Sequence, residues 1–190
     1  MNSILNKEMR ENVQNLSSLI RYNNKIHIRN ENVAEHSFYV VLYTMELARI
    51  IELSDREYKY VLEHAAIHDV HEVITSDIPH NVKSKFPVIN TDLQRFEDYF
   101  NETYFPSHVY ERDFLMRINL LEDIVLLADV LSVYQYSVTE INLGNKTFEE
   151  VKKNAKDRIE DVVANIMRDE TVEELSKDQI FNLLNEIRTH

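Results

Sequence analysis

Apolar residues recur along most of this chain at steps of three and four positions, the spacing that gathers them on one face of an α-helix. The pattern is present in residues 4–20, 32–52, 55–73 and 89–104. It returns in residues 120–143, 147–168 and 172–188. The sequence therefore predicts an all-α fold, a bundle of about seven to nine helices.

Polar residues indicate where several of these helices begin and end. Asn32 followed by Glu35 resembles a capping box at the start of a helix, with Asn in place of Ser or Thr. The Asn-rich stretch 21–32 before it is expected to be a loop. Residues 75–81 are also expected to be a turn or loop, because proline at position 79 disfavours helix in the residue before it. Residues 106–112 are predicted to be a connection.

Residues 120–143 form the most apolar segment of the chain, with apolar positions on every face of the predicted helix. Such a helix is expected at the centre of the bundle and to end at Gly144. Asp129 stands in the middle of this segment. Because an uncompensated buried carboxylate costs several kcal/mol, Asp129 needs a partner, which could be an Arg side chain, a helix cap or a metal ion.

Composition excludes several classes of function. The one glycine rules out a P-loop and a dinucleotide fingerprint, which need several glycines. The absence of cysteine rules out disulfides, thiolate nucleophiles and thiolate zinc sites, and fits a reducing cytoplasm. The net charge of −12 argues against binding polymeric nucleic acid.

Length and hydropathy bound the organisation of the chain. With 190 residues, 44% of them hydrophobic and 28% charged, the chain is expected to form one domain over residues 1–190. No signal peptide is visible, and no window approaches the roughly 18 apolar residues of a membrane span. The chain is therefore predicted to be a cytoplasmic protein with no membrane partner.

Candidate chemistry concentrates in residues 64–72, which hold three histidines and two carboxylates. His68 and Asp69 directly follow an apolar helical run, a pattern more typical of metal ligands than of packing. His36 lies in the first turn of its predicted helix and would, taken alone, be interpreted as a surface or cap residue. With Asp129 these residues make a set of two imidazoles and two carboxylates. Such a set suits one divalent ion, Co, Mn, Zn, Fe or Mg, with water completing its shell.

His64 and His68 are also separated by the i, i+4 spacing of zinc ligands. No matching second pair follows downstream, so a two-metal site is not expected. His64 is interpreted as a packed residue or one that supports His68.

The order of these four candidate ligands resembles that of the HD-domain superfamily of metal-dependent phosphohydrolases. The flanking residues are similar to those of the HD-domain 5′-deoxynucleotidases: Arg21-Tyr22, Glu31-Asn32-Val33-Ala34-Glu35-His36-Ser37, His68-Asp69-Val70-His71-Glu72, Asp77-Ile78-Pro79, Val82-Lys83 and Ala128-Asp129. The resemblance covers about residues 16–135. It implies an all-α HD domain in which His36, His68, Asp69 and Asp129 hold one divalent metal.

The resemblance also implies roles around the metal. Glu72 and Asp77 would act as acid/base or water-positioning groups, and Glu72 shares a helical face with the His68-Asp69 pair by its spacing. The implied substrate-binding residues are Arg21, Tyr22, Pro79 and Lys83, with Arg21 and Lys83 as phosphate-binding cations. Tyr22 stands where the family commonly has Trp, which leaves the choice of sugar and base open. Taken singly, each of these residues could instead be a solvated, capping or core residue.

The activity implied by the resemblance is hydrolysis of deoxynucleoside 5′-monophosphates to deoxynucleoside and phosphate. One alternative is a deoxynucleoside triphosphate phosphohydrolase of the small phage HD class, acting on dATP-type substrates. A second alternative is an inactive nucleotide-binding module. The resemblance further implies a homo-oligomer, usually a dimer.

Overall fold

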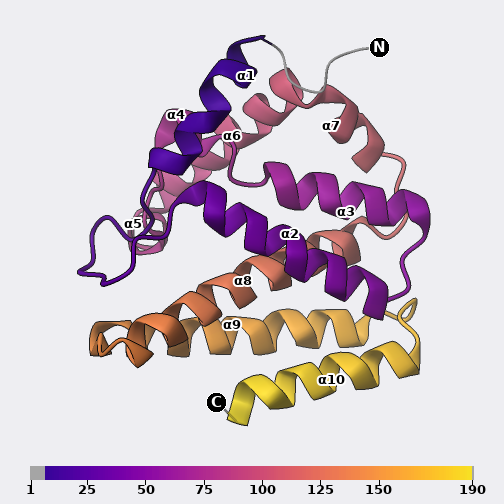
Figure 1. The fold of residues 1–190 in the computed structure, drawn as a ribbon. Helices are drawn as coiled ribbons and strands as arrows, with labels where there is room; N and C mark the ends of the chain where they lie inside the picture. Colours follow the sequence, from indigo (N-terminus) through magenta and orange to yellow (C-terminus); the bar gives the residue numbers. More distant parts are fainter. Residues whose placement is uncertain (1–6, 190) are drawn as a thin grey trace.

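The computed structural model describes residues 7–189, apart from the side chains of His80, Asn81 and Arg188, and the regular elements of this range are helices (Figure 1). The all-α prediction is therefore confirmed. In chain order the elements are α1 (Lys7–Asn12), the 3₁₀ helix η1 (Val13–Ser18), α2 (Val33–Ile50), α3 (Asp55–Ile67), α4 (Glu72–Thr75), α5 (His80–Lys85), α6 (Pro87–Tyr104), α7 (Pro106–Arg112), α8 (Ile118–Asn142), the 3₁₀ helix η2 (Lys146–Phe148), α9 (Glu149–Arg168) and α10 (Glu174–Thr189).

Helix α8 lies at the centre, between α2 and α9, as its all-round apolar pattern predicts (Figure 1). Leu121, Ile124 and Ala128 on α8 are fully buried, together with Val40 of α2 and Ile159 of α9. Burial of each of these Leu, Ile and Val side chains stabilises the fold by about 1.5–3 kcal/mol. By length and composition alone, α8 is also long and apolar enough to cross a membrane. Of its 18-residue window, 61% is buried inside the fold, and a core helix meets the same criterion.

Three segments differ from the helix pattern predicted from sequence. Residues 106–112 are helix α7 and not a connection, because Pro106 occupies the first helical turn, where its missing N–H and fixed φ are tolerated. The predicted helix 4–20 is α1 followed by a 3₁₀ helix, and its residues 4–6 lie outside the described range. Residues 80–85, partly assigned to a loop, form the short helix α5.

The third predicted helix, residues 55–73, is also interrupted. It ends at Ile67, and α4 begins at Glu72. Between them the chain turns through i→i+3 hydrogen bonds, such as Val70 N to Ile67 O at 3.0 Å and Glu72 N to Asp69 O at 3.1 Å. Glu72 therefore does not continue the helical face of His68 and Asp69, contrary to the prediction from its spacing.

The loop between η1 and α2 is tied at its base. The amide of Arg21 donates to the carbonyl of Glu31 at 2.9 Å, and the amide of Val33 donates to the carbonyl of Leu19 at 2.9 Å. Asn32 then caps α2, since its side-chain oxygen accepts from the amide of Glu35 at 2.9 Å. The predicted start of this helix is confirmed, and it fixes His36 in the first turn.

Candidate metal centre and active site

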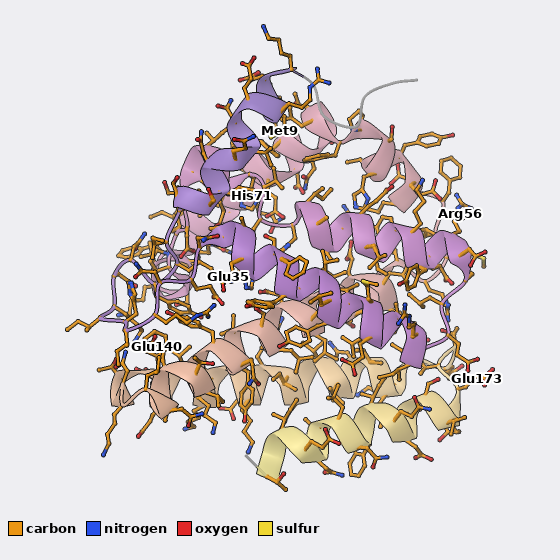
Figure 2. The ribbon with its side chains drawn as sticks, in the orientation of Figure 1. Met9, Glu35, Arg56, His71, Glu140 and Glu173 are labelled. Carbon is orange, nitrogen blue, oxygen red and sulfur yellow. The ribbon has the colours of Figure 1, made fainter. Side chains whose placement is uncertain are left out.

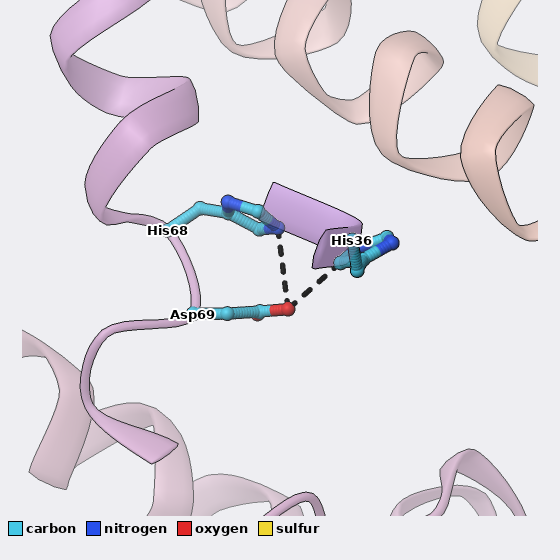
Figure 3. Close-up of side chains that lie close together, drawn as sticks. All are labelled: His36, His68 and Asp69. Carbon is cyan, nitrogen blue, oxygen red and sulfur yellow. Dashed lines mark ion pairs between the residues drawn. The ribbon is translucent and has the colours of Figure 1, made fainter. Parts of the chain in front are cut away.

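Three of the four predicted ligands converge in the fold (Figure 3). His36 comes from the start of α2, and His68 and Asp69 come from the turn after α3. Asp69 Oδ2 lies 3.2 Å from His68 Nε2 and 3.6 Å from His36 Nε2. One ligand atom from each of the three residues lies within 4.8 Å of the others, so together they could hold a metal ion.

The fourth predicted ligand reaches the same point from α8. Asp129 Oδ1 lies 3.0 Å from His36 Nε2. The carboxylate that the apolar context of α8 made conspicuous therefore faces the cluster, more than ninety residues along the chain from His36, although its side chain is 32% exposed and not buried as the sequence suggested. The structure brings together all four residues that the sequence pattern singled out.

Both imidazoles are oriented by hydrogen bonds on their far nitrogens. His36 Nδ1 lies 3.0 Å from Ser132 Oγ on α8, and His68 Nδ1 lies 2.8 Å from the carbonyl of Ala65. The Nε2 atoms of both rings are buried and make no well-aligned hydrogen bond within the described residues, although the carboxylate oxygens of Asp129 and Asp69 lie 3.0 and 3.2 Å away. Because a buried nitrogen without a partner is costly, these two atoms facing two carboxylates fit the donor set of a bound cation.

The charges around the cluster are mutually dependent. Burial works against ionisation of Asp69 and Asp129, but the imidazoles of His68 and His36 respectively keep the pKa of each carboxyl below its usual value. Burial also opposes protonation of His68, yet Asp69 outweighs it and raises the pKa of this imidazole to about 9. The pKa of His36 falls to about 4, through burial and then the charge of Arg21. The carboxylates thus remain ionised and attract a cation.

A cavity of about 180 Å³ opens beside the cluster. Glu72 and Lys83 line it together with His68 and Asp69. Glu72 is 4% exposed, and its Oε2 atom has no hydrogen-bond partner among the described residues. Burial, and then the charges of Asp69 and Asp77, raise the pKa of this carboxyl above its usual value. Glu72 is therefore a carboxyl that can hold a proton near the metal site.

Arg21 lies close to the cluster as well. The charges of Asp69 and Asp129 act on its guanidinium, and Glu31 lies 3.9 Å from Arg21 Nη1. That distance is too long for a hydrogen bond, and Nη1 has no other partner in the described part of the chain. A buried guanidinium with a free donor is suited to an anion.

A hydrogen bond joins the segment of Tyr22 to that of Asp77. Tyr22 has a φ of 58°, in the left-handed region, and its amide donates to Asp77 Oδ2 at 3.3 Å. Its ring stacks on Tyr136 with centroids 5.1 Å apart, and the edge of Phe148 covers it at 5.1 Å. Asp77 therefore holds the Arg21-Tyr22 segment in place. Ile78, rather than Pro79, lines the cavity.

Several residues of the site were missed in the sequence. Ser132 gave no signal beyond a hydroxyl in an apolar helix. On α6, Asn90, Gln94 and Glu97 line the cavity, and their spacing on one helical face was the available signal. Burial, and then Asp69, raise the pKa of Glu97 to about 7.

His64 is packed, as interpreted from the sequence. Its ring stacks on Tyr60 and His108, and His64 Nδ1 lies 3.2 Å from His108 Nε2. His108, which the sequence gave no role, is buried at this contact. His36 and His68 thus belong to the ligand cluster, and His64 and His108 belong to an aromatic stack.

Comparison with known proteins places these features in a family. The family model described as 5′-deoxynucleotidase YfbR-like matches residues 9–174. A 4′-phosphooxetanocin A phosphatase from Priestia megaterium is 26% identical over 159 residues, covering 79% of this chain and 81% of the relative. A 5′-deoxynucleotidase from Photobacterium profundum is 29% identical over 145 residues, covering 66% of this chain and 71% of that protein.

Solved structures share the fold. A conserved hypothetical protein from Pyrococcus furiosus aligns with a TM-score of 0.73 at 19% identity, covering 97% of this chain and 100% of that protein. The HD phosphohydrolase of cyanophage S-2L, solved with dA and one catalytic Zn²⁺ ion, aligns with a TM-score of 0.68 at 14% identity over the whole of both chains.

Proposed function

The chain belongs to the YfbR-like 5′-deoxynucleotidase family of HD-domain phosphohydrolases, and on this premise we propose that it hydrolyses deoxynucleoside 5′-monophosphates to deoxynucleoside and phosphate with one bound divalent ion. The observation that carries the proposal is the convergence of the buried Nε2 atoms of His36 and His68 on the carboxylates of Asp69 and Asp129, beside a cavity. These four residues would hold the ion, whose identity among Co, Mn, Zn, Fe and Mg is left to experiment.

The protein's own groups divide the remaining work. A bound divalent ion would supply Lewis acidity and lower the pKa of a water. Arg21, with its free Nη1, and Lys83, in the cavity wall, would bind the non-bridging phosphate oxygens and offset their charge. Glu72, whose raised pKa lets it carry a proton near neutral pH, would donate that proton to the leaving 5′ oxygen.

Tyr22 and Asp77 would have supporting roles. Tyr22 keeps a flat aromatic surface near the cluster, but Tyr136 and Phe148 already pack against it. Asp77 fixes the backbone that places Arg21, through its bond from the Tyr22 amide. We therefore propose Glu72 as the proton-handling group and Asp77 as a positioning residue. Pro79 stays a predicted contact.

Hydrolysis of deoxynucleoside triphosphates is the main competing activity. A triphosphate needs further cations, and Arg29 in the nearby loop is already paired with Glu35. This pairing favours the monophosphate. We also propose a homodimer, on the family resemblance; size-exclusion chromatography with light scattering measures this directly.

The test is a substrate panel. Metal-free protein is loaded with each ion and assayed on dNMPs, NMPs and dNTPs, with phosphate and tripolyphosphate measured separately. We expect phosphate release from dNMPs, and loss of both bound metal and turnover in Asp129→Ala with the helical circular dichroism retained. Asp157→Ala, an exposed carboxylate on α9, is the matched control and should behave as wild type. Turnover by metal-depleted Asp129→Ala, or tripolyphosphate as the main product, would contradict the proposal.

A further inference from the structure

Glu140, near the end of α8, is a buried carboxylate outside the metal centre (Figure 2). It is 0% exposed. Its Oε1 atom accepts from the amide of Arg29 at 2.7 Å, and its Oε2 atom accepts from the amide of Ile28 at 2.8 Å. The side chain of Asn145 also donates to Oε2, at 2.7 Å. Burial alone would raise the pKa of Glu140, but these donors outweigh it and keep the pKa below its usual value.

The partners of Glu140 fix the far end of the 21–31 loop, the segment between η1 and α2. Asn145 donates a further bond to the carbonyl of Ile26 at 2.9 Å, and the Tyr136 hydroxyl donates to the carbonyl of Arg29. The tip of the loop is thus held by α8 and the residues just after it, by bonds to backbone groups. Because these bonds go to the main chain and not to side chains, they fix the position of the loop backbone.

The same loop carries the proposed phosphate-binding cation at its other end. Arg21 starts the loop, its amide bonds to Glu31 across the base, and its guanidinium lies near Asp69 and Asp129. The next residue, Tyr22, stacks on Tyr136. The loop is therefore held at its base and at its tip, and Arg21 is placed by both.

One face of α8 joins the loop to the metal centre. Asp129, Ser132, Tyr136 and Glu140 follow one another at spacings of three, four and four, which places them in one row along the helix. Asp129 contacts His36, and Ser132 orients the same ring. Tyr136 stacks on Tyr22, and Glu140 anchors the tip of the loop. A single rigid helix thus sets the distance between the metal centre and the loop that carries Arg21.

We propose that Glu140 is a positioning residue for the nucleotide: by anchoring the tip of the 21–31 loop it holds Arg21 where the substrate phosphate binds, so its loss weakens substrate binding while the metal centre stays intact. This inference rests on the proposed function. In Glu140→Gln one carboxylate oxygen becomes an NH₂ group. Whichever way the amide turns, that NH₂ faces a donor of the loop or of Asn145, and at least one anchoring bond is lost.

The experiment compares steady-state kinetics and bound metal in four proteins, using the dNMP that the wild type turns over best. Glu140→Gln should raise KM about tenfold with kcat within about twofold, and with the metal content unchanged. Tyr136→Phe removes only the hydroxyl bound to the Arg29 carbonyl and keeps the ring under Tyr22, so it should raise KM about threefold. Glu173→Gln makes the same chemical change at an exposed residue far from the loop (Figure 2) and should match wild type.

The outcomes separate this inference from the proposed function. A wild type that turns over no nucleotide with any of the ions overturns the proposed function, and this inference with it. An active wild type with unchanged KM in Tyr136→Phe and in folded Glu140→Gln overturns the inference alone. Loss of metal in parallel with activity in Glu140→Gln also overturns it, because Glu140 would then support the metal centre. If Glu140→Gln does not fold, Tyr136→Phe and Asn145→Ala decide, and an unchanged KM in both rejects the inference.

Discussion

Replacing Ser132 by alanine should weaken metal binding without touching any proposed ligand. Ser132 Oγ lies 3.0 Å from His36 Nδ1, and the two residues are 3% and 0% exposed. For His36 Nε2 to bind a cation through its lone pair, the ring proton must lie on Nδ1, which then donates to the serine oxygen. Alanine removes the acceptor that selects this tautomer and holds the ring towards Asp129.

The expected size follows from what the ring loses. His36 is 0% exposed, and a buried N–H left without a partner costs about 1–3 kcal/mol. Loss of the group that orients a metal-binding histidine typically lowers metal affinity about 10- to 100-fold, which corresponds to about 1.4–2.8 kcal/mol. We therefore expect Ser132→Ala to fold and to bind the ion about 10- to 100-fold more weakly than wild type. When the metal concentration is limiting, its turnover should fall with the fraction of protein that holds the ion.

Ser137→Ala is the matched control on the same helix. Ser137 is also buried, but its hydroxyl donates to the carbonyl of Tyr134 at 2.6 Å and not to a ligand. Metal affinity is measured by titrating metal-free proteins in a calorimeter, and stability by urea unfolding of the same samples. If Ser132→Ala and Ser137→Ala bind the ion equally well, Ser132 does not orient His36 and the account of the site is wrong.

Three further predictions follow from single contacts. Glu72→Gln should retain the metal but lower kcat about 10²- to 10⁴-fold, measured by phosphate release; unchanged kcat excludes Glu72 as the proton-handling group. The bond from Arg117, with further bonds from Ser54, outweighs burial and lowers the pKa of Glu57 from an ordinary 4.5 to about 2. The stability that ionised Glu57 contributes is therefore fully present above pH 4.5 and is lost as the pH falls towards 2. Glu57→Gln should make the urea midpoint depend less on pH in this range. An equally steep dependence in the variant contradicts the assignment. Ile159→Ala, at a fully buried position of α9, should lower the free energy of unfolding by about 2–5 kcal/mol in urea, and a loss under about 1 kcal/mol would show that the site repacks.

The parts of the fold that periodicity could predict were those in which one face is consistently apolar. Helices α2, α8 and α9 appear where the pattern places them, and α8 is central because its apolar residues are on all sides. The pattern failed where local bonding decides. Seven residues, Pro106–Arg112, were expected to be a connection, although proline suits the first turn of a helix. The helix break after Ile67 depends on i→i+3 bonds that no side-chain pattern records.

The same contrast holds in the candidate site. Asp129 stood out because a carboxylate is unusual in an apolar helix, and with His36, His68 and Asp69 it completed a ligand set whose order then matched the family. Ser132 and Glu140 lie on the same helix but contradict nothing in the sequence, since a serine is tolerated in a core and a glutamate near a helix end is usually solvated. Only the packing of the 21–31 loop onto α8 shows that Glu140 is buried. Residues defined by tertiary contacts therefore could not be predicted from local pattern.

The distribution of charge explains why the site needs both a metal and the loop. Asp69 and Asp129 keep their negative charges at the ligand cluster beside the cavity, in a chain whose net charge is −12, and a nucleotide phosphate adds further negative charge. Lys83 and Arg21 are the cations that the structure places near them. A phosphate dianion beside the two ionised aspartates carries more negative charge than these two cations offset, so a divalent ion in the proposed site would assist substrate binding as well as chemistry. With so few cations available, a small displacement of Arg21 removes a large share of the attraction, which is why an anchor as remote as Glu140 matters.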